Sequence, residues 1–210
     1  MKTNTLPLQA SAFYHIYNRG VNGEDLFKEK KNYDFFLGRY VRFVSPVADT
    51  YAYCLLKNHF HFLIRTKSPE EIESFGNSLQ KKINGSENHP LILSRAMSSF
   101  FKSYAQAMNK AYGRTGALFE EPFRRKEVAS DAYLSQLIQY IHFNPENHGF
   151  TEDFQSYPFS SFGELLDEER TWLARTEVMA RLHGKDNFLR IHQEGGRRID
   201  FSMDFEDRPF

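Results

Sequence analysis

Residues 51–66, YAYCLLKNHFHFLIRT, constrain the fold more than any other part of the chain. The stretch predicts two strands with a tight connection at Lys57-Asn58, and the second strand carries His59 and His61. Side chains alternate across a strand, so the two histidines share one face, while the other face is wholly apolar and suited to helix packing. The histidine face holds His59, His61, Leu63 and Arg65, and the apolar face holds Phe60, Phe62 and Ile64. Two imidazoles side by side are close enough to hold one metal ion.

The composition is that of a chain with a substantial core. Of the 210 residues, 40% are apolar, and 21 are Phe and 11 are Tyr. This length allows one domain, or one domain with an appendage. The absence of long apolar runs and of a signal-like start predicts a soluble, cytoplasmic protein that does not enter a membrane. The single cysteine, Cys54, excludes an internal disulfide and is expected to be a core thiol.

Charge is distributed unevenly although the net charge is zero. Residues 151–210 hold 13 acidic and 8 basic side chains, which leaves 19 basic and 14 acidic side chains in residues 1–150. A basic N-terminal body with an acidic tail is compatible with nucleic-acid binding. Charge clusters are more often solvated faces, so the pattern alone decides nothing.

Hydrophobic periodicity predicts alternating strands and helices. Alternation by two marks strands, and recurrence every three to four residues marks helices. Ser68 followed by Glu71 is a capping-box pattern that predicts a helix start. The predicted elements are a strand at 12–17, a helix at 30–44, two strands in 51–66, a helix from 68, a loop at 84–90, a helix at 91–112, a strand at 124–128 and a helix from Ser130 or Asp131 to Asn144, ended by Pro145.

This order predicts an α+β ferredoxin-like sandwich with a central antiparallel four-stranded sheet. Its helices cover one face of the sheet and leave the other open. The first strand and the histidine strand are then the inner strands, with the histidines on the open face. We expect a core domain at 1–162 and an acidic helical extension and tail at 163–210, with helices near 163–169, 171–183 and 185–193 and a polar tail from Gly195.

The last helix of the core contributes Tyr140 and, four residues later, Asn144. Positions i and i+4 share a helix face. Two histidines, a tyrosine and an amide oxygen would form a phosphoryl-transfer site, in which a metal polarises a phosphate oxygen and the tyrosine hydroxyl attacks phosphorus. Periodicity alone does not select Tyr140 among the 11 tyrosines. His15 and His142 are expected to be structural.

Several segments together resemble the HUH superfamily of single-strand DNA nucleases, and more closely its REP-associated tyrosine transposases. Their order and spacing make the resemblance specific, although each segment alone is a weak signal. The segments are FYHIYNRG at 13–20, LLKNHFHFLIRT at 55–66, AYGRTGALFEEPFR at 111–124, YLSQLIQYIHFNPENHGF at 133–150 and SYPFSSF at 156–162. Phe119 stands where many relatives have Trp, and residues 163–210 lie beyond the matched core.

The resemblance implies a metal, Mg²⁺ or Mn²⁺, held by His59 and His61, with Asn144 as a third, polar ligand. It implies that Tyr140 is the nucleophile in the Tyr-x-x-x-Asn-Pro context. The implied reaction is cleavage and strand transfer of single-stranded, hairpin-forming DNA through a 5′-phosphotyrosine, by a monomer or a homodimer. Arg114, Arg124, Arg125 and Lys126 are expected to contact DNA phosphates, in a salt-dependent manner.

Alternatives remain at each position. The histidines could be polar residues on a half-exposed strand, Tyr140 an aromatic at a helix–sheet contact, and Asn144 a helix-end residue before a proline. The basic residues could be ordinary surface charge. A second function is a catalytically inactive ferredoxin-like protein that binds single-stranded nucleic acid by stacking bases on Phe13, Tyr14, Tyr51 and Tyr53.

Overall fold

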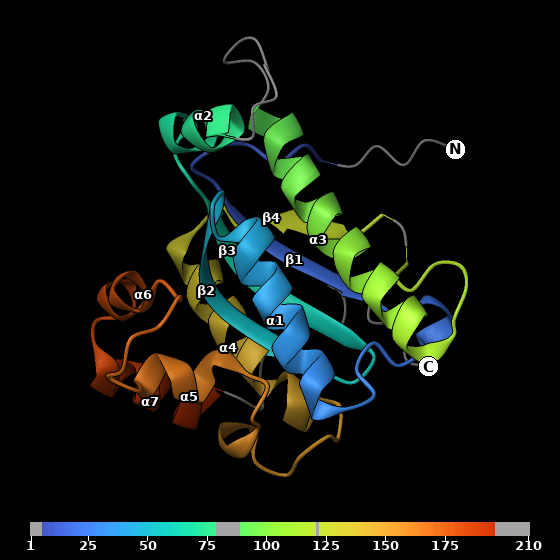
Figure 1. The fold of residues 1–210 in the computed structure, drawn as a ribbon. Coiled ribbons are helices and arrows are strands. Elements are labelled where there is room, and N and C mark those ends of the chain that lie inside the picture. Colours follow the sequence, from blue (N-terminus) through green and yellow to red (C-terminus); the bar gives the residue numbers. More distant parts are fainter. Residues whose placement is uncertain (1–5, 79–88, 121, 196–210) are drawn as a thin grey trace.

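Four strands pair into one antiparallel sheet in the order β2-β3-β1-β4 (Figure 1). The computed structural model describes residues 6–78, 89–120 and 122–195. The strands are β1 (Phe13–Arg19), β2 (Ala48–Leu55), β3 (His59–Thr66) and β4 (Arg124–Glu127). The predicted α+β fold with a central four-stranded antiparallel sheet is confirmed, and β1 and β3 are its inner strands. Residues 84–88 of the predicted loop at 84–90 lie outside the described residues. The predicted tail lies outside them from residue 196 onward.

The register of β1 against β3 determines which side chains accompany the histidines. Tyr17 pairs with His61 and Arg19 pairs with His59. Directly paired residues point to the same face of an antiparallel sheet. One face of the sheet centre therefore carries the two histidines together with Tyr17 and Arg19.

Helices α1 (Lys30–Val44) and α3 (His89–Tyr112) cover the apolar face of the sheet. Aromatic rings dominate this contact: the Tyr40 ring stacks on Phe62 at 4.1 Å, and Phe36 meets Phe60 at 5.2 Å and Phe100 at 4.8 Å. All five side chains are buried. The packing explains why the second strand alternates Phe with His, because only its Phe face enters this layer. Helix α2 (Pro69–Ser78) starts at the predicted capping box, where Ser68 and Glu71 exchange hydrogen bonds.

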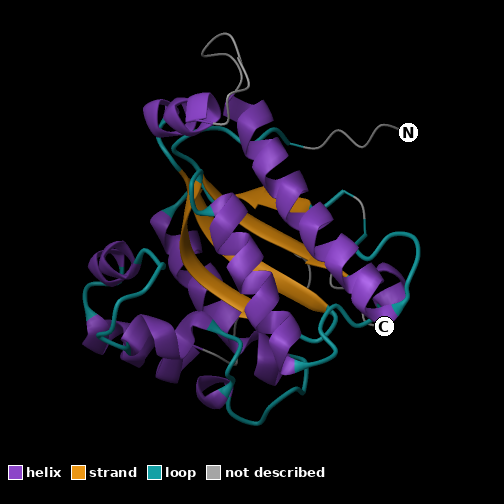
Figure 2. Ribbon diagram, in the orientation of Figure 1, coloured by secondary structure: helices purple, strands orange, loops and turns teal. Residues whose placement is uncertain are grey.

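Helix α4 (Asp131–Asn147) lies across β2 and β3 on the opposite side of the sheet from α1 and α3 (Figures 1 and 2). The expectation of an open histidine face is therefore wrong over this half of the sheet. The reason is the composition of α4, whose residues from 137 to 145 are all buried. A helix buried nearly all round cannot remain on a surface and packs into the interior.

Pro145 does not end α4 as predicted, because the helix continues to Asn147. A proline removes one backbone donor, which costs least close to a helix end. Here the last carbonyls still find partners, since His148 N–H donates to Asn144 O at 3.0 Å and Phe150 N–H donates to Pro145 O at 2.8 Å.

The chain after α4 forms short helices that pack against α4 and β2. They are the 3-10 helix η3 (Phe154–Ser156) and helices α5 (Ser161–Leu166), α6 (Arg175–Arg181) and α7 (Lys185–Gly195). The three α-helices overlap the regions where helices were expected, and η3 was not expected. A second 3-10 turn, η1 (Val21–Gly23), follows β1. Within the described residues, no helix combines the length and apolarity needed to cross a membrane.

A buried chain of hydrogen bonds joins α4 to the helices that follow it. His192 Nδ1 lies 2.7 Å from the Phe188 carbonyl, which only accepts, so His192 Nε2 is left as an acceptor. His142 Nδ1 donates to that nitrogen at 2.8 Å, and His142 Nε2 accepts from Ser161 Oγ at 2.8 Å. Ser161 Oγ accepts the Tyr53 N–H at 2.8 Å. The expectation that His142 is structural fits this arrangement, which ties α4 to β2, α5 and α7.

This chain makes stability depend on pH. Burial lowers the pKa of His192 from 6.5 to about 4, although its hydrogen bond to Phe188 opposes the shift. Between these values the unfolded chain binds a proton that the folded chain does not, so stability is lost as the pH falls below 6.5. We predict a declining free energy of unfolding from pH 7 to 5, measured by urea titration. His192→Gln should reduce the slope by up to ~1.4 kcal/mol per pH unit.

The control is His183→Asn, which removes an exposed histidine between α6 and α7 and should leave the slope as in the parent chain. A stability that is constant from pH 7 to 5 in the parent chain would contradict the assignment of neutral buried histidines.

Candidate active site at the histidine face

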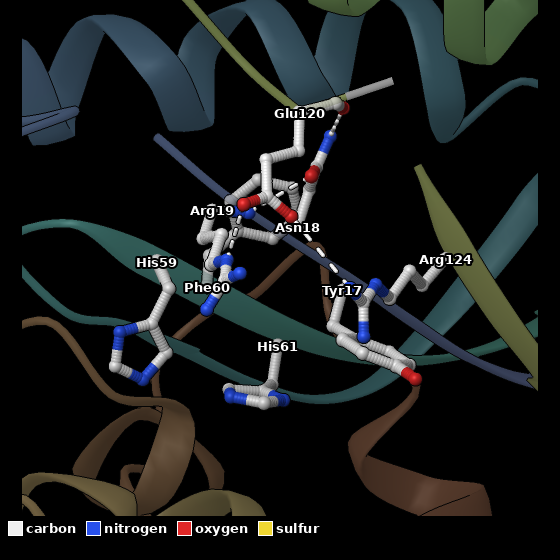
Figure 3. A pocket seen from close by; sticks show the side chains of 8 residues that line it. All are labelled: Tyr17, Asn18, Arg19, His59, Phe60, His61, Glu120 and Arg124. Carbon is white, nitrogen blue, oxygen red and sulfur yellow. Dashed lines mark hydrogen bonds and ion pairs between the residues drawn. The ribbon is translucent and has the colours of Figure 1, made fainter. Parts of the chain in front are cut away.

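His59 and His61 lie at the start of β3 with both side chains buried. Together with Tyr17, Arg19 and Arg124 from the neighbouring strands they line a pocket of about 20 Å³ (Figure 3). That volume accommodates one water molecule or one small ion. Neither Tyr140 nor Asn144 lines this pocket. The alternative of a half-exposed strand does not hold, because β3 is nearly all buried and has a small polar opening at the histidines.

Hydrogen bonds orient both imidazoles. His59 Nδ1 lies 2.8 Å from Asn58 Oδ1, which only accepts, so His59 carries its proton on Nδ1 and presents the Nε2 lone pair. His61 Nδ1 lies 2.9 Å from His15 Nε2. Burial, with a smaller contribution from the charge of His148, lowers the pKa of His61 to about 3. Both rings therefore have the form of metal-binding histidines, in which the second nitrogen is held by a neighbouring group.

Tyr140 reaches the histidine face from α4. Its side chain is buried, and its ring meets the His61 ring edge-on, with centroids 5.6 Å apart and an interplanar angle of 86°. The His15 ring lies 6.3 Å away in a similar edge-on arrangement. The structure thus brings together Tyr140 and His61, which are far apart in the sequence and come from different elements.

Asn144 lies one turn further along α4 and is completely buried. Its Nδ2 donates to the Tyr140 carbonyl at 3.1 Å, which is the local hydrogen bond expected of a residue near a helix end. Its Oδ1 has no hydrogen-bond partner among the described residues, and the same is true of His61 Nε2. Buried polar atoms without partners are costly, so these two are candidates for contact with a missing ligand.

The donor set fits a divalent metal. Imidazole nitrogens and an amide oxygen are ligands that Mn²⁺ and related ions accept. Among the described residues no three His, Cys, Asp or Glu side chains cluster into a metal site. A site on this face would therefore need an uncharged oxygen such as Asn144 Oδ1 as its third protein ligand.

The four predicted DNA-contacting residues do not share one surface. Arg124 pairs with Tyr17 and Lys126 pairs with His15, which places both on the histidine face. Arg125 points to the opposite face, where its guanidinium lies 4.3 Å from the centre of the Phe123 ring. Arg114 follows α3, where it forms an ion pair with Glu24 and a hydrogen bond to Asn109.

Sequence reasoning missed two histidines at this site. His15 was expected to be structural, and the structure makes it the hydrogen-bond partner of His61. His148, which follows α4, places its ring 4.7 Å from the His59 ring. The alternation of His15 and Tyr17 on β1 was a usable signal, but only the register shows that this face meets His61.

The fold is similar to that of a solved structure. The chain superposes on the solved structure of a REP-associated tyrosine transposase bound to a REP hairpin with a TM-score of 0.58 and 12% identity, covering 79% of this chain and 85% of that one. At this identity the likeness concerns the fold.

The sequence comparison points the same way. A REP-associated tyrosine transposase of Haemophilus influenzae is 23% identical over 119 residues, which are 54% of this chain and 58% of the relative. The chain thus spans little more than half the length of this curated relative. No protein-family model matches the chain. The predicted resemblance to REP-associated tyrosine transposases is confirmed in sequence and in fold.

Proposed function

We propose that this protein is a metal-dependent tyrosine transposase that cleaves single-stranded, hairpin-forming DNA and transfers the cut strand. The observation that carries the proposal is the contact between the Tyr140 and His61 rings on a buried polar face. Burying three histidines, a tyrosine and an asparagine together costs free energy, because each polar group loses its hydration. A purely structural core would not need this set of residues. The names of the relatives, a tyrosine transposase and a transposase bound to a hairpin, support the same reading.

In the proposed reaction Tyr140 Oη attacks the scissile phosphorus. The phenol gives up its proton, the Oη–P bond forms, and the bond from phosphorus to the 3′ oxygen breaks, so that the departing strand takes up a proton as a 3′-OH. A phenol has an ordinary pKa of about 10 and needs assistance at neutral pH. A divalent ion held by His59, His61 and Asn144 would supply charge stabilisation at the phosphate. Strand transfer reverses the step with a different 3′-OH.

The surrounding residues bind and orient. His15 holds the His61 ring through Nδ1, and Asn58 holds the His59 ring, so both Nε2 atoms are kept in position. Arg124 and Lys126 extend the same face toward the β4 edge and are placed to contact phosphates. The pocket beside the histidines is lined by Arg19, Arg124 and Glu120, and Glu120 forms ion pairs with both arginines. Two cations against one carboxylate leave a positive balance, which favours an anionic substrate.

The structure does not favour the alternative of a stacking platform for bases. Tyr14, Tyr51 and Tyr53 are buried, so they present no ring face to a strand. The hydroxyls of Tyr51 and Tyr53 bond to Glu177 and Glu164 of the C-terminal helices, which cover this part of the sheet. Of the four aromatics expected to stack, Phe13 alone is partly exposed.

Tyr140→Phe should abolish the covalent protein–DNA adduct and leave DNA affinity unchanged, because the variant loses only the attacking oxygen. The adduct is measured on a denaturing gel after incubation with a hairpin oligonucleotide and Mn²⁺, and affinity by fluorescence anisotropy. Tyr133→Phe removes a hydroxyl from the first turn of the same helix and should retain the adduct. An adduct formed by Tyr140→Phe would rule out the assigned nucleophile.

His59→Ala should lose metal-dependent cleavage although Tyr140 remains.

His15→Ala should weaken Mn²⁺ binding by about 10- to 100-fold, because loss of a hydrogen bond to a ligand's second nitrogen has effects of that size. Isothermal titration calorimetry with Mn²⁺ alone measures this without any DNA. His183→Asn is the matched control and should bind as the parent chain does. Equal affinities for His15→Ala and the parent would show that His15 has only a packing role.

A further inference from the structure

A second and larger cavity lies on the other face of the sheet, beside β4. It has a volume of about 810 Å³ and runs between α3 and the segment that leads into β4. A cavity of this size suits an organic ligand larger than a single ion. Nothing in the proposed chemistry at the histidine face uses it.

Aromatic rings form the apolar part of this groove. Phe119 is buried, while Phe101 and Phe123 are partly exposed and line it from α3 and from the chain just before β4. The Phe101 ring centre lies 5.2 Å from that of Phe119 and 5.2 Å from that of Phe123. Phe101 and Phe123 are both partly exposed where they line the groove, and a partly exposed aromatic ring is what a nucleobase stacks on.

Cations and polar groups complete the groove. Arg125 lies over the Phe123 ring, and its Nε is buried without a hydrogen-bond partner among the described residues. Lys102 and Gln106 are exposed on the α3 side of the groove. A guanidinium over an aromatic ring, with an ammonium nearby, matches a ligand that combines a planar ring with a phosphate.

The groove adjoins the histidine pocket. Asn18 and Glu120, which line the histidine pocket (Figure 3), also line the groove. Asn18 Nδ2 donates to the Glu120 carbonyl at 2.9 Å, and the Glu120 carboxylate pairs with Arg19 at 2.5 Å. A strand whose phosphate lies at the histidines would therefore have a neighbouring nucleotide beside this pair of residues, next to the groove.

We propose that this groove binds an unpaired base next to the scissile phosphate, stacked on Phe123 and Phe101 with its phosphate near Arg125 and Lys102. The inference rests on the proposed function, because it takes a DNA strand to be the ligand of the histidine face. It gives Arg125 a role that differs from that of Arg124, although the two are adjacent in sequence. Arg124 contacts the strand at the histidine face, and Arg125 contacts it after the strand has crossed the sheet edge.

The test is an abasic scan. The probe is a DNA hairpin with single-stranded deoxyadenosine flanks, in which each flank position in turn lacks its base. Anisotropy measures the affinity of the intact chain. Loss of one stacked base should weaken binding by about 5- to 140-fold at one or two adjacent positions. Phe123→Ala should bind more weakly and show no further loss at those positions.

Lys102→Ala and Lys110→Ala form a matched pair on α3, since both lysines are exposed but only Lys102 lines the groove. Lys102→Ala should weaken binding more than Lys110→Ala does, and this comparison holds even if Phe123→Ala is poorly folded. A flat scan, or a scan whose penalty persists in Phe123→Ala, overturns the groove assignment.

The covalent adduct, read in the same samples, separates the two proposals. An adduct with a flat scan removes the groove and leaves the transposase. A position-specific scan without an adduct keeps the groove as a base-binding site and removes the catalytic proposal. No binding of the hairpin by the parent chain overturns both.

Discussion

The packing of α4 across β2 and β3 is the interaction on which the rest of the site depends. It places the Tyr140 ring against His61 and at the same time removes the histidine face from bulk water. Burial then keeps the imidazoles neutral, because charging them in the interior is costly. Neutral imidazoles can bind a metal, whereas protonated ones cannot. One helix position therefore sets both the geometry and the electrostatic state of the candidate site.

The chain that follows α4 helps to hold the helix against the sheet. The hydrogen bonds from His142 to Ser161 and His192 tie the helix to α5 and α7 on the side away from Tyr140. Ion pairs add to this at the surface, as between Arg181 and Asp131 at the start of α4. Exposed pairs contribute little energy individually, so the buried hydrogen bonds and packing dominate. The division of the chain into a core at 1–162 and an extension at 163–210 stays a prediction. Within the described residues, Glu164, Glu177 and His192 bond to side chains of β2 and α4.

Local pattern was enough to predict the strands, their order and the histidine face. Alternation in β3 separates Phe from His directly, and the two faces meet very different surroundings in the structure. The failures concern tertiary packing. The composition of α4 points to burial, but it does not show that the helix packs on the histidine face or that the proline in its last turn is tolerated. Tyr51 and Tyr53 are covered by helices α6 and α5, which carry Glu177 and Glu164. These helices lie far along the sequence, so local pattern does not show that the two tyrosines are buried.

The site residues show the same division between local and global information. His59 and His61 were selected by strand alternation, and Tyr140 and Asn144 mainly by resemblance to known transposases; the roles of all four stay predictions that the geometry supports. His15 was missed because its role depends on the register of β1 with β3. Composition does not distinguish Arg124 from Arg125, because both are basic residues in one charge cluster. Side chains alternate along a strand, so the predicted strand at 124–128 already places the two arginines on opposite faces of the sheet.

Tyr140 contacts His61 of the same chain, so the active site should be complete within one chain. Complementation between two inactive variants tests this. Tyr140→Phe and His61→Ala are mixed and incubated with a hairpin oligonucleotide and Mn²⁺, and the adduct is compared with that of each variant alone and of the parent chain. A site built within one chain predicts that the mixture forms no more adduct than the separate variants. Adduct restored in the mixture would contradict the account, because it would require Tyr140 of one chain to act at the histidines of another.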